Sequence, residues 1–169
     1  MSLMGILERV ADVQGLDKAI EPARRAVQKT LPTGLKNFLH GTWLGHPLHP
    51  VLVHVPVGSW LSAGILDVVP AFRPAGTVLI GAGVAGAVPA ALTGAADWSE
   101  QDAGVRRLGA IHASLNVVAL SLYAGSLVAR GKGRWGLGLG LSYAGLGVAY
   151  DSPSPRPHRP LPRATSDPA

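Results

Sequence analysis

The sequence predicts an all-α integral membrane protein: a four-helix transmembrane bundle of up-down topology, preceded by an N-terminal amphipathic helical arm. Apolar residues make up 47% of the 169 residues, and charged residues only 15%, against about 25% in ordinary soluble domains. Most of the apolar residues lie between residues 51 and 150. The period-two alternation of a transmembrane barrel is absent there, so we expect helices, which satisfy their own backbone groups in lipid.

Three regions follow from this distribution: an N-terminal amphipathic or interfacial arm (1–44), a four-span transmembrane domain (45–150) and a tail (151–169). The tail is rich in proline, a composition typical of disorder. In the arm, apolar residues recur at helical spacing and form one face. Two interpretations of the arm stay open: a helix lying on anionic lipid, and a solvated helix that packs on a partner or on nothing. The apolar face comprises Ile6, Val10, Val13, Ile20, Ala23 and Val27.

Four apolar segments predict the spans, at 50–69, 75–96, 108–129 and 135–150. A helix of about 20 residues is about 30 Å long, which matches the hydrocarbon core of a bilayer. The last segment is the shortest and is rich in glycine. Short links between the segments predict antiparallel neighbours.

The distribution of basic residues predicts the orientation of the spans. With four spans, eleven of the 15 Lys and Arg residues lie on the side that holds both termini. The excess of Lys and Arg in cytoplasmic segments therefore predicts cytoplasmic N- and C-termini. The net charge of +5 does not indicate nucleic-acid binding, because the basic residues flank apolar segments, and we expect the lipid bilayer as the partner instead.

Small residues at a spacing of four predict close helix packing in two spans. They are Ala82, Gly86, Ala90 and Gly94 in the second span, and Gly136, Gly140 and Ala144 in the fourth. We also expect Trp60 to pack on a neighbouring helix, and Asp67 to bind Arg73 or the backbone.

Histidines and an aspartate are expected to converge at one end of the bundle. His54 lies about one turn into the first span and His112 about one turn into the third, and Asp97 returns to the same face. Neutral imidazole is the commonest metal ligand and a frequent haem ligand. We therefore expect a haem b or transition-metal site, with the identity of the cofactor open. The predicted cofactor ligands are His49, His54 and His112; the metal set adds His46 and Asp97, with Asn116 and Trp98 orienting the ligands.

Three functions stay open on this evidence, and none of them implies independent catalytic activity. The first is a membrane redox module for electron transfer through the converging histidines. The second is a structural or assembly subunit in which the histidines only lock helices together. The third is a proton or ion conduit through Asp67, Asn116 and His112. The chain has no cysteine, which excludes disulfides and cysteine-ligated iron–sulfur clusters in it.

The motifs of this chain resemble those of the DUF2231 family of predicted bacterial membrane proteins. They are the stretch Gly45-His46-Pro47-Leu48-His49-Pro50, then Val55-Pro56, Asp67, Thr93-Gly94 with Asp97-Trp98, and His112 with Asn116. The resemblance covers about residues 40–150 and implies a four-helix domain of unestablished function in the bacterial inner membrane. Some members are joined to Rieske-type domains, which implies a redox partner of that kind; a homo-oligomer is the other assembly expected. Members continue past the fourth span to a further histidine, whereas this chain continues into its proline-rich tail. If that histidine is a ligand in the family, the resemblance implies an incomplete site in this chain.

Overall fold

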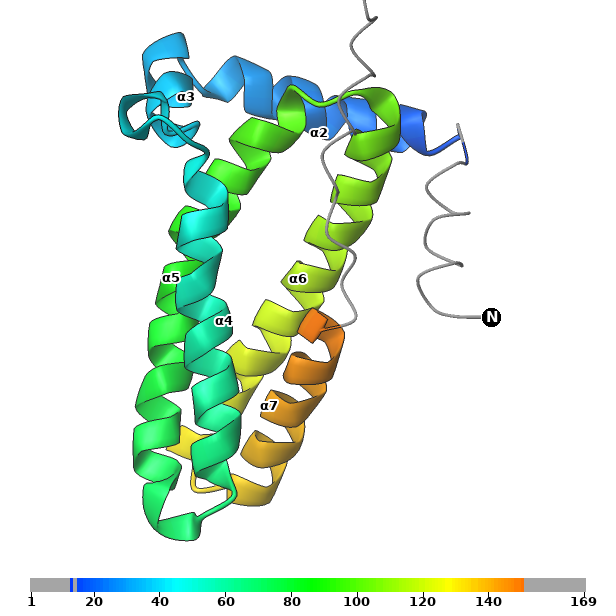
Figure 1. Ribbon diagram of the computed structural model, residues 1–169. Helices are drawn as coiled ribbons and strands as arrows, with labels where there is room; N and C mark the ends of the chain where they lie inside the picture. Colours follow the sequence, from blue (N-terminus) through cyan, green and yellow to red (C-terminus); the bar gives the residue numbers. More distant parts are fainter. Residues whose placement is uncertain (1–12, 14, 151–169) are drawn as a thin grey trace, which may run out of the picture.

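The computed structural model describes residue 13 and residues 15–150, which form α-helices and short 3-10 helices and contain no strand (Figure 1). The apolar residues Ile6 and Val10 of the arm, and the tail at 151–169, lie outside the described residues. The elements are α2 (Leu16–Thr30), α3 (Thr33–Leu39), η1 (Thr42–Leu44), α4 (Leu48–Asp67), η2 (Pro70–Phe72), α5 (Arg73–Ser99), α6 (Ala103–Gly131) and α7 (Trp135–Tyr150).

Three of these helices are long and apolar enough to cross a membrane: α4, α5 with the preceding η2, and α6. Their most apolar stretches have mean hydropathies of 1.2, 1.8 and 1.5, respectively. The helix α7 has only 16 residues, and the predicted fourth span is therefore not confirmed. The prediction of an all-helical membrane protein holds, with three candidate spans.

The helices α4 to α7 form two hairpins, α4 with α5 and α6 with α7. The contacts within each hairpin are more extensive than those between α5 and α6. Figure 1 shows the hairpins meeting at the end that carries their tight turns, with α2 lying across the opposite end.

Glycine allows α5 to approach α4 closely. A Cβ built on Gly86 would lie 2.6 Å from Val55, and one on Gly94 would lie 2.7 Å from the His49 ring. Ala90 is buried in the same row, whereas Ala82 is exposed. The predicted packing role is therefore confirmed for Gly86, Ala90 and Gly94, because side chains of α4 occupy the space that a Cβ on either glycine would need.

The small residues predicted to pack α7 against its neighbours do not do so within the described chain. Gly136, Gly140 and Ala144 are exposed, and a Cβ on either glycine would meet no described atom within 4 Å. Gly138 and Gly145 face α6 instead, with Cβ positions 2.6 Å from the Arg130 side chain and 3.0 Å from the Tyr123 ring. The prediction that Gly136, Gly140 and Ala144 pack against another helix of this chain is therefore wrong, because α7 turns its other face toward α6.

An aromatic stack joins the two hairpins. Trp60 of α4 and Tyr123 of α6 are both buried, and their ring centroids lie 4.2 Å apart with an interplanar angle of 13°. Gly83 of α5 lies against the indole and leaves room for it. The expectation that Trp60 packs on a neighbouring helix is confirmed, and the stack places the core in the half of the molecule near the tight turns.

Left-handed glycines set the direction in which the arm enters α4. Gly41 (φ 73°) and Gly45 (φ 81°) flank η1, and a Cβ at Gly41 would collide with the backbone carbonyl of His46. Only glycine adopts this conformation without a steric cost. Pro47 then holds the extended backbone that precedes α4. The Gly45–Pro50 motif therefore has a structural role, because it sets the point and direction at which α4 begins.

Candidate functional site

The polar groups of the membrane helices gather in two clusters at opposite ends. One cluster holds the histidines predicted as ligands, near α2 and α3. The other surrounds Asp67 and Arg130 at the end with the tight turns.

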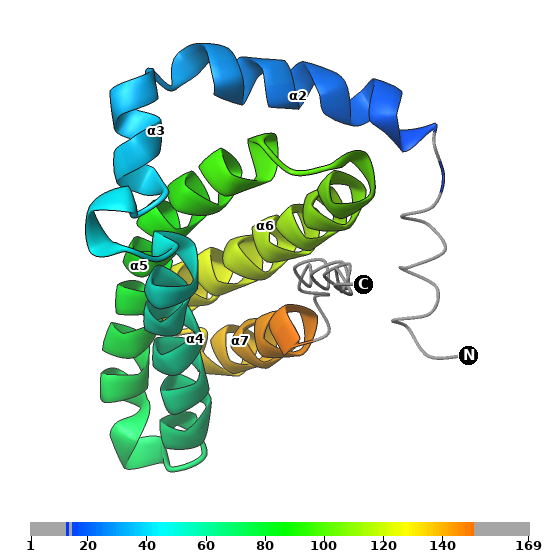
Figure 2. The same cartoon turned by 45° about the horizontal axis from the view of Figure 1, so that its top comes forward.

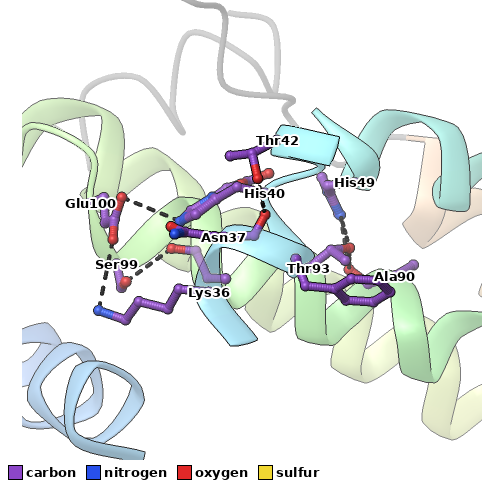
Figure 3. A network of polar contacts seen from close by, with 12 residues as sticks. Lys36, Asn37, His40, Thr42, His49, Ala90, Thr93, Ser99 and Glu100 are labelled. Atoms are coloured by element: carbon purple, nitrogen blue, oxygen red, sulfur yellow. Dashed lines mark hydrogen bonds and ion pairs between the residues drawn. The ribbon is translucent and has the colours of Figure 1, made fainter. Parts of the chain in front are cut away.

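His49 links α4 to α5. Its Nδ1 atom donates to the carbonyl of Ala90 at 2.8 Å, and the hydroxyl of Thr93 lies 3.4 Å from the same nitrogen (Figure 3). Gly94 leaves the space that the ring occupies. The hydrogen bond to Ala90, worth about 0.5–1.5 kcal/mol, holds the first turn of α4 against α5.

His46 and His54 face solvent or lipid rather than the helix interface. His46 is exposed in the turn before α4, and His54 is exposed on α4 itself. The Nδ1 atom of His54 donates to the carbonyl of Pro50 one turn earlier, at 2.6 Å. His54 therefore bonds within its own helix and does not join His49.

His112 and Asn116 form a pair within α6. The Asn116 side-chain amide donates to His112 Nε2 at 3.1 Å and to the His112 carbonyl at 2.9 Å. Asn116 thus contacts the imidazole that it was expected to orient, and its role there stays a prediction.

Asp97 binds a histidine that the sequence analysis did not single out. Its carboxylate lies 2.6 Å from Nδ1 of His40, and the other ring nitrogen of His40 lies 3.3 Å from the Glu100 carboxylate. Lys36 lies 3.7 Å from Glu100 and completes the cluster, which ties α3 to the end of α5 (Figure 3). A signal was present in the sequence, since Lys36 and His40 share a helical face, but their partners lie about 60 positions away.

Trp98 has a structural role at the turn between α5 and α6. Its indole N–H donates to the carbonyl of Arg106 at 2.8 Å, and its ring lies against Gly109. It therefore orients this turn.

The predicted ligands are therefore not brought together. His49, His112 and Asp97 each bind a different partner, and His54 lies on another face of α4. Among residue 13 and residues 15–150, no three His, Asp or Glu side chains are placed to hold a metal ion. The geometry therefore gives no support to the predicted haem or metal centre. The prediction compared the depths of these residues along their helices but not the directions in which their side chains point.

The second cluster is a buried ion pair between the hairpins. Arg130 binds both carboxylate oxygens of Asp67, at 2.8 and 2.5 Å, and both side chains are almost completely buried. The remaining guanidinium hydrogens reach the hydroxyls of Ser126, Thr77 and Ser142 at 3.1, 3.2 and 3.1 Å. Arginine has five N–H donors, and all five have an acceptor here.

This cluster corrects the expected partner of Asp67. Arg73 donates only to the Asp67 backbone carbonyl, at 3.5 Å, whereas the carboxylate binds Arg130 from 63 positions away. Gly76 and Gly138 make room for the two side chains. The network joins α4, α5, α6 and α7, because each helix supplies at least one of its members.

Comparison with known proteins identifies the family. The family model described as "Predicted membrane protein (DUF2231)" matches residues 45–150. The chain belongs to this family. The match begins at the Gly45–Pro50 motif and ends with α7. It therefore includes all four helices of the hairpins and the Asp67–Arg130 network. No curated protein and no solved structure matches the chain.

Proposed function

We propose that this DUF2231 protein is a non-catalytic structural or assembly subunit of a membrane complex, in which α7 contacts a neighbouring subunit. The observation that carries the proposal is the exposed row of Gly136, Gly140 and Ala144 on α7. Such rows allow membrane helices to pack closely, yet nothing in the described chain covers this one.

The length of α7 supports the same proposal. Its 16 residues extend about 24 Å, less than the roughly 30 Å of a bilayer core. A short helix rich in glycine is more stable in a membrane when neighbouring helices shield its ends from lipid. In the three longer helices only 17–22% of the most apolar stretch is buried inside the chain, which leaves ample surface for lipid and a second subunit.

The other two functions have weaker support. A redox module needs a cofactor near His49, His54 and His112, and these side chains bond to separate partners. A conduit needs a polar route between His112 and Asp67. The partner of Asp67 is Arg130, about 27 Å along α6 from His112 by helical rise, and its five donors are all engaged.

The orientation is proposed on the same grounds as before. The α2 end carries more Lys and Arg residues than the end with the tight turns, which favours a cytoplasmic α2 end in a bacterial inner membrane. If α7 is embedded antiparallel to α6, both termini lie on that side.

Substitution of an exposed glycine tests the assembly. We expect Gly140→Leu to lower the mass of the particle extracted from native membranes in polymer nanodiscs, measured by mass photometry. The matched control is Gly58→Leu, at an exposed glycine of α4 that likewise meets no described atom within 4 Å. A wild-type particle containing one copy and nothing else, or equal masses for all three proteins, would contradict the proposal. A fall in mass to that of a single chain would support it, and the mass of the wild type distinguishes a second copy from a different chain.

A further inference from the structure

The helix α2 is held transversely at one end of the membrane helices (Figure 2). Asp17 accepts two hydrogen bonds from Arg107 of α6, both 2.9 Å long. Arg24 and Gln28 donate to the free carbonyl of Ser99 at the end of α5, at 3.1 and 3.0 Å. Because α5 and α6 are candidate spans, this attachment places α2 near the level of the lipid headgroups.

The faces of α2 differ in chemistry. Leu16 and Ile20 lie beside Ala110, Ile111 and Leu115 of α6. On the opposite face Lys18, Arg25 and Lys29 are exposed, at spacings of seven and four that align them along the helix. Arg25 bonds to Glu21, yet its side chain stays 77% exposed.

An exposed apolar patch continues from α2 toward the first span. Phe38 and Trp43 stack with centroids 5.7 Å apart and are 55% and 61% exposed. Leu35 and Leu44 are exposed in the same segment. Aromatic side chains in a segment that enters a membrane helix are typical of the lipid–water interface, where an apolar ring and a polar edge are both satisfied.

We propose that the outer face of α2 binds the headgroups of anionic phospholipids, with the Phe38–Trp43 patch inserted at the interface. Two observations favour lipid over an acidic protein or a nucleic acid. The basic row and the aromatic patch belong to one continuous segment, and that segment is fixed beside helices that cross the bilayer. Each basic side chain near an anionic surface contributes roughly a fivefold increase in affinity. This inference is independent of the proposed assembly through α7.

The test uses the full chain, purified in detergent and placed in nanodiscs of phosphatidylcholine with or without phosphatidylglycerol. The variant Lys18→Gln/Arg25→Gln/Lys29→Gln removes the charges and leaves Asp17 and Arg24 in place. The matched control, Lys18→Arg/Arg25→Lys/Lys29→Arg, keeps every charge. Native mass spectrometry counts the retained lipids, and an Ala26→Cys fluorophore reports on the outer face in a chain without other cysteines.

We expect the wild type and the charge-keeping control to retain phosphatidylglycerol over phosphatidylcholine, with a blue shift of the fluorophore. The neutral variant should lose roughly a hundredfold in affinity for phosphatidylglycerol, and added salt should weaken the wild type by screening. Equal retention by the wild type and the neutral variant would overturn the proposal. So would binding of polyglutamate or DNA to the wild type without any preference for phosphatidylglycerol.

Discussion

Removing Arg130 tests whether the buried ion pair holds the two hairpins together. Arg130→Met leaves the Asp67 carboxylate buried without a partner, and breaking such a pair costs about 3–5 kcal/mol. The hydroxyls of Thr77, Ser126 and Ser142 add little to this cost. Each of them also donates to a backbone carbonyl and keeps that bond in the variant. The predicted loss therefore comes almost entirely from the carboxylate.

The double variant Asp67→Leu/Arg130→Met removes both charges. We expect the free energy of unfolding of this variant to be within about 1 kcal/mol of the wild-type value or higher, because replacing a whole buried pair by apolar groups is often neutral or stabilising. The two sites should therefore show a large coupling energy in a double-mutant cycle. Unfolding by SDS in mixed micelles, followed by fluorescence, gives the free energies.

Arg73→Met is the matched control. Arg73 reaches only the backbone carbonyl of Asp67, at 3.5 Å, so we expect a change below about 0.5 kcal/mol. The reasoning is refuted if Arg73→Met costs as much as Arg130→Met, or if the coupling energy between Asp67 and Arg130 is near zero.

Three further predictions concern the other end of the molecule. Gly94→Ala should cost about 1–3 kcal/mol in SDS unfolding by forcing α5 from the His49 ring, and no loss would contradict the close approach. His49→Ala should lower the free energy of unfolding by about 0.5–1.5 kcal/mol, because it removes one hydrogen bond to the Ala90 carbonyl, which keeps the bond from the Thr93 hydroxyl. The exposed His54→Ala should lower it by less than about 0.5 kcal/mol, and equal losses would refute this assignment. The hydrogen bond from Arg107 lowers the pKa of Asp17 below its ordinary value of 3.8, so the stabilisation of α2 is present above that value and is lost as the pH falls through the lowered pKa. The protection of the α2 amides against hydrogen exchange, relative to their intrinsic rates, should fall in the acidic range. Arg107→Met should weaken this pH dependence and leave the part that comes from Glu21, whose pKa is lowered by Arg25 and Arg24.

Composition and span length were enough to predict the membrane helices. Segments of about 20 apolar residues must be helical in lipid, and α4, α5 and α6 follow the predicted spans closely. The fourth segment was short enough that length alone did not decide whether it spans. The family followed from local motifs, because the Gly45–Pro50 stretch and its companions are specific in type and spacing.

Side-chain partners were harder to predict than helices. Arg130 lies in a basic turn by sequence, where it resembles a solvated interface residue, and only the packing of α6 on α4 turns it toward Asp67. His40 lies in the arm, and its contact with Asp97 depends on the chain folding back at Gly41 and Gly45. Such long-range pairs depend on how each helix is rotated about its axis. The sequence does not determine this rotation when apolar residues are spread around the whole helix.

The small residues show the same limit. Both rows were equally regular in sequence, yet Gly86 and Gly94 of the α5 row face α4, whereas the row in α7 faces away from the described chain. A helix that is apolar on every side carries no signal for its inward face. The exposed row is therefore the feature on which the proposed assembly depends most.

The most direct test of that assembly is photo-crosslinking from α7 in intact membranes. Ala144→Cys would carry a photoreactive maleimide in the chain without other cysteines, and Val88→Cys, exposed on α5, would be the control. The account predicts a protein adduct of discrete mass from position 144 and lipid adducts from position 88. Lipid adducts alone from both positions would contradict it.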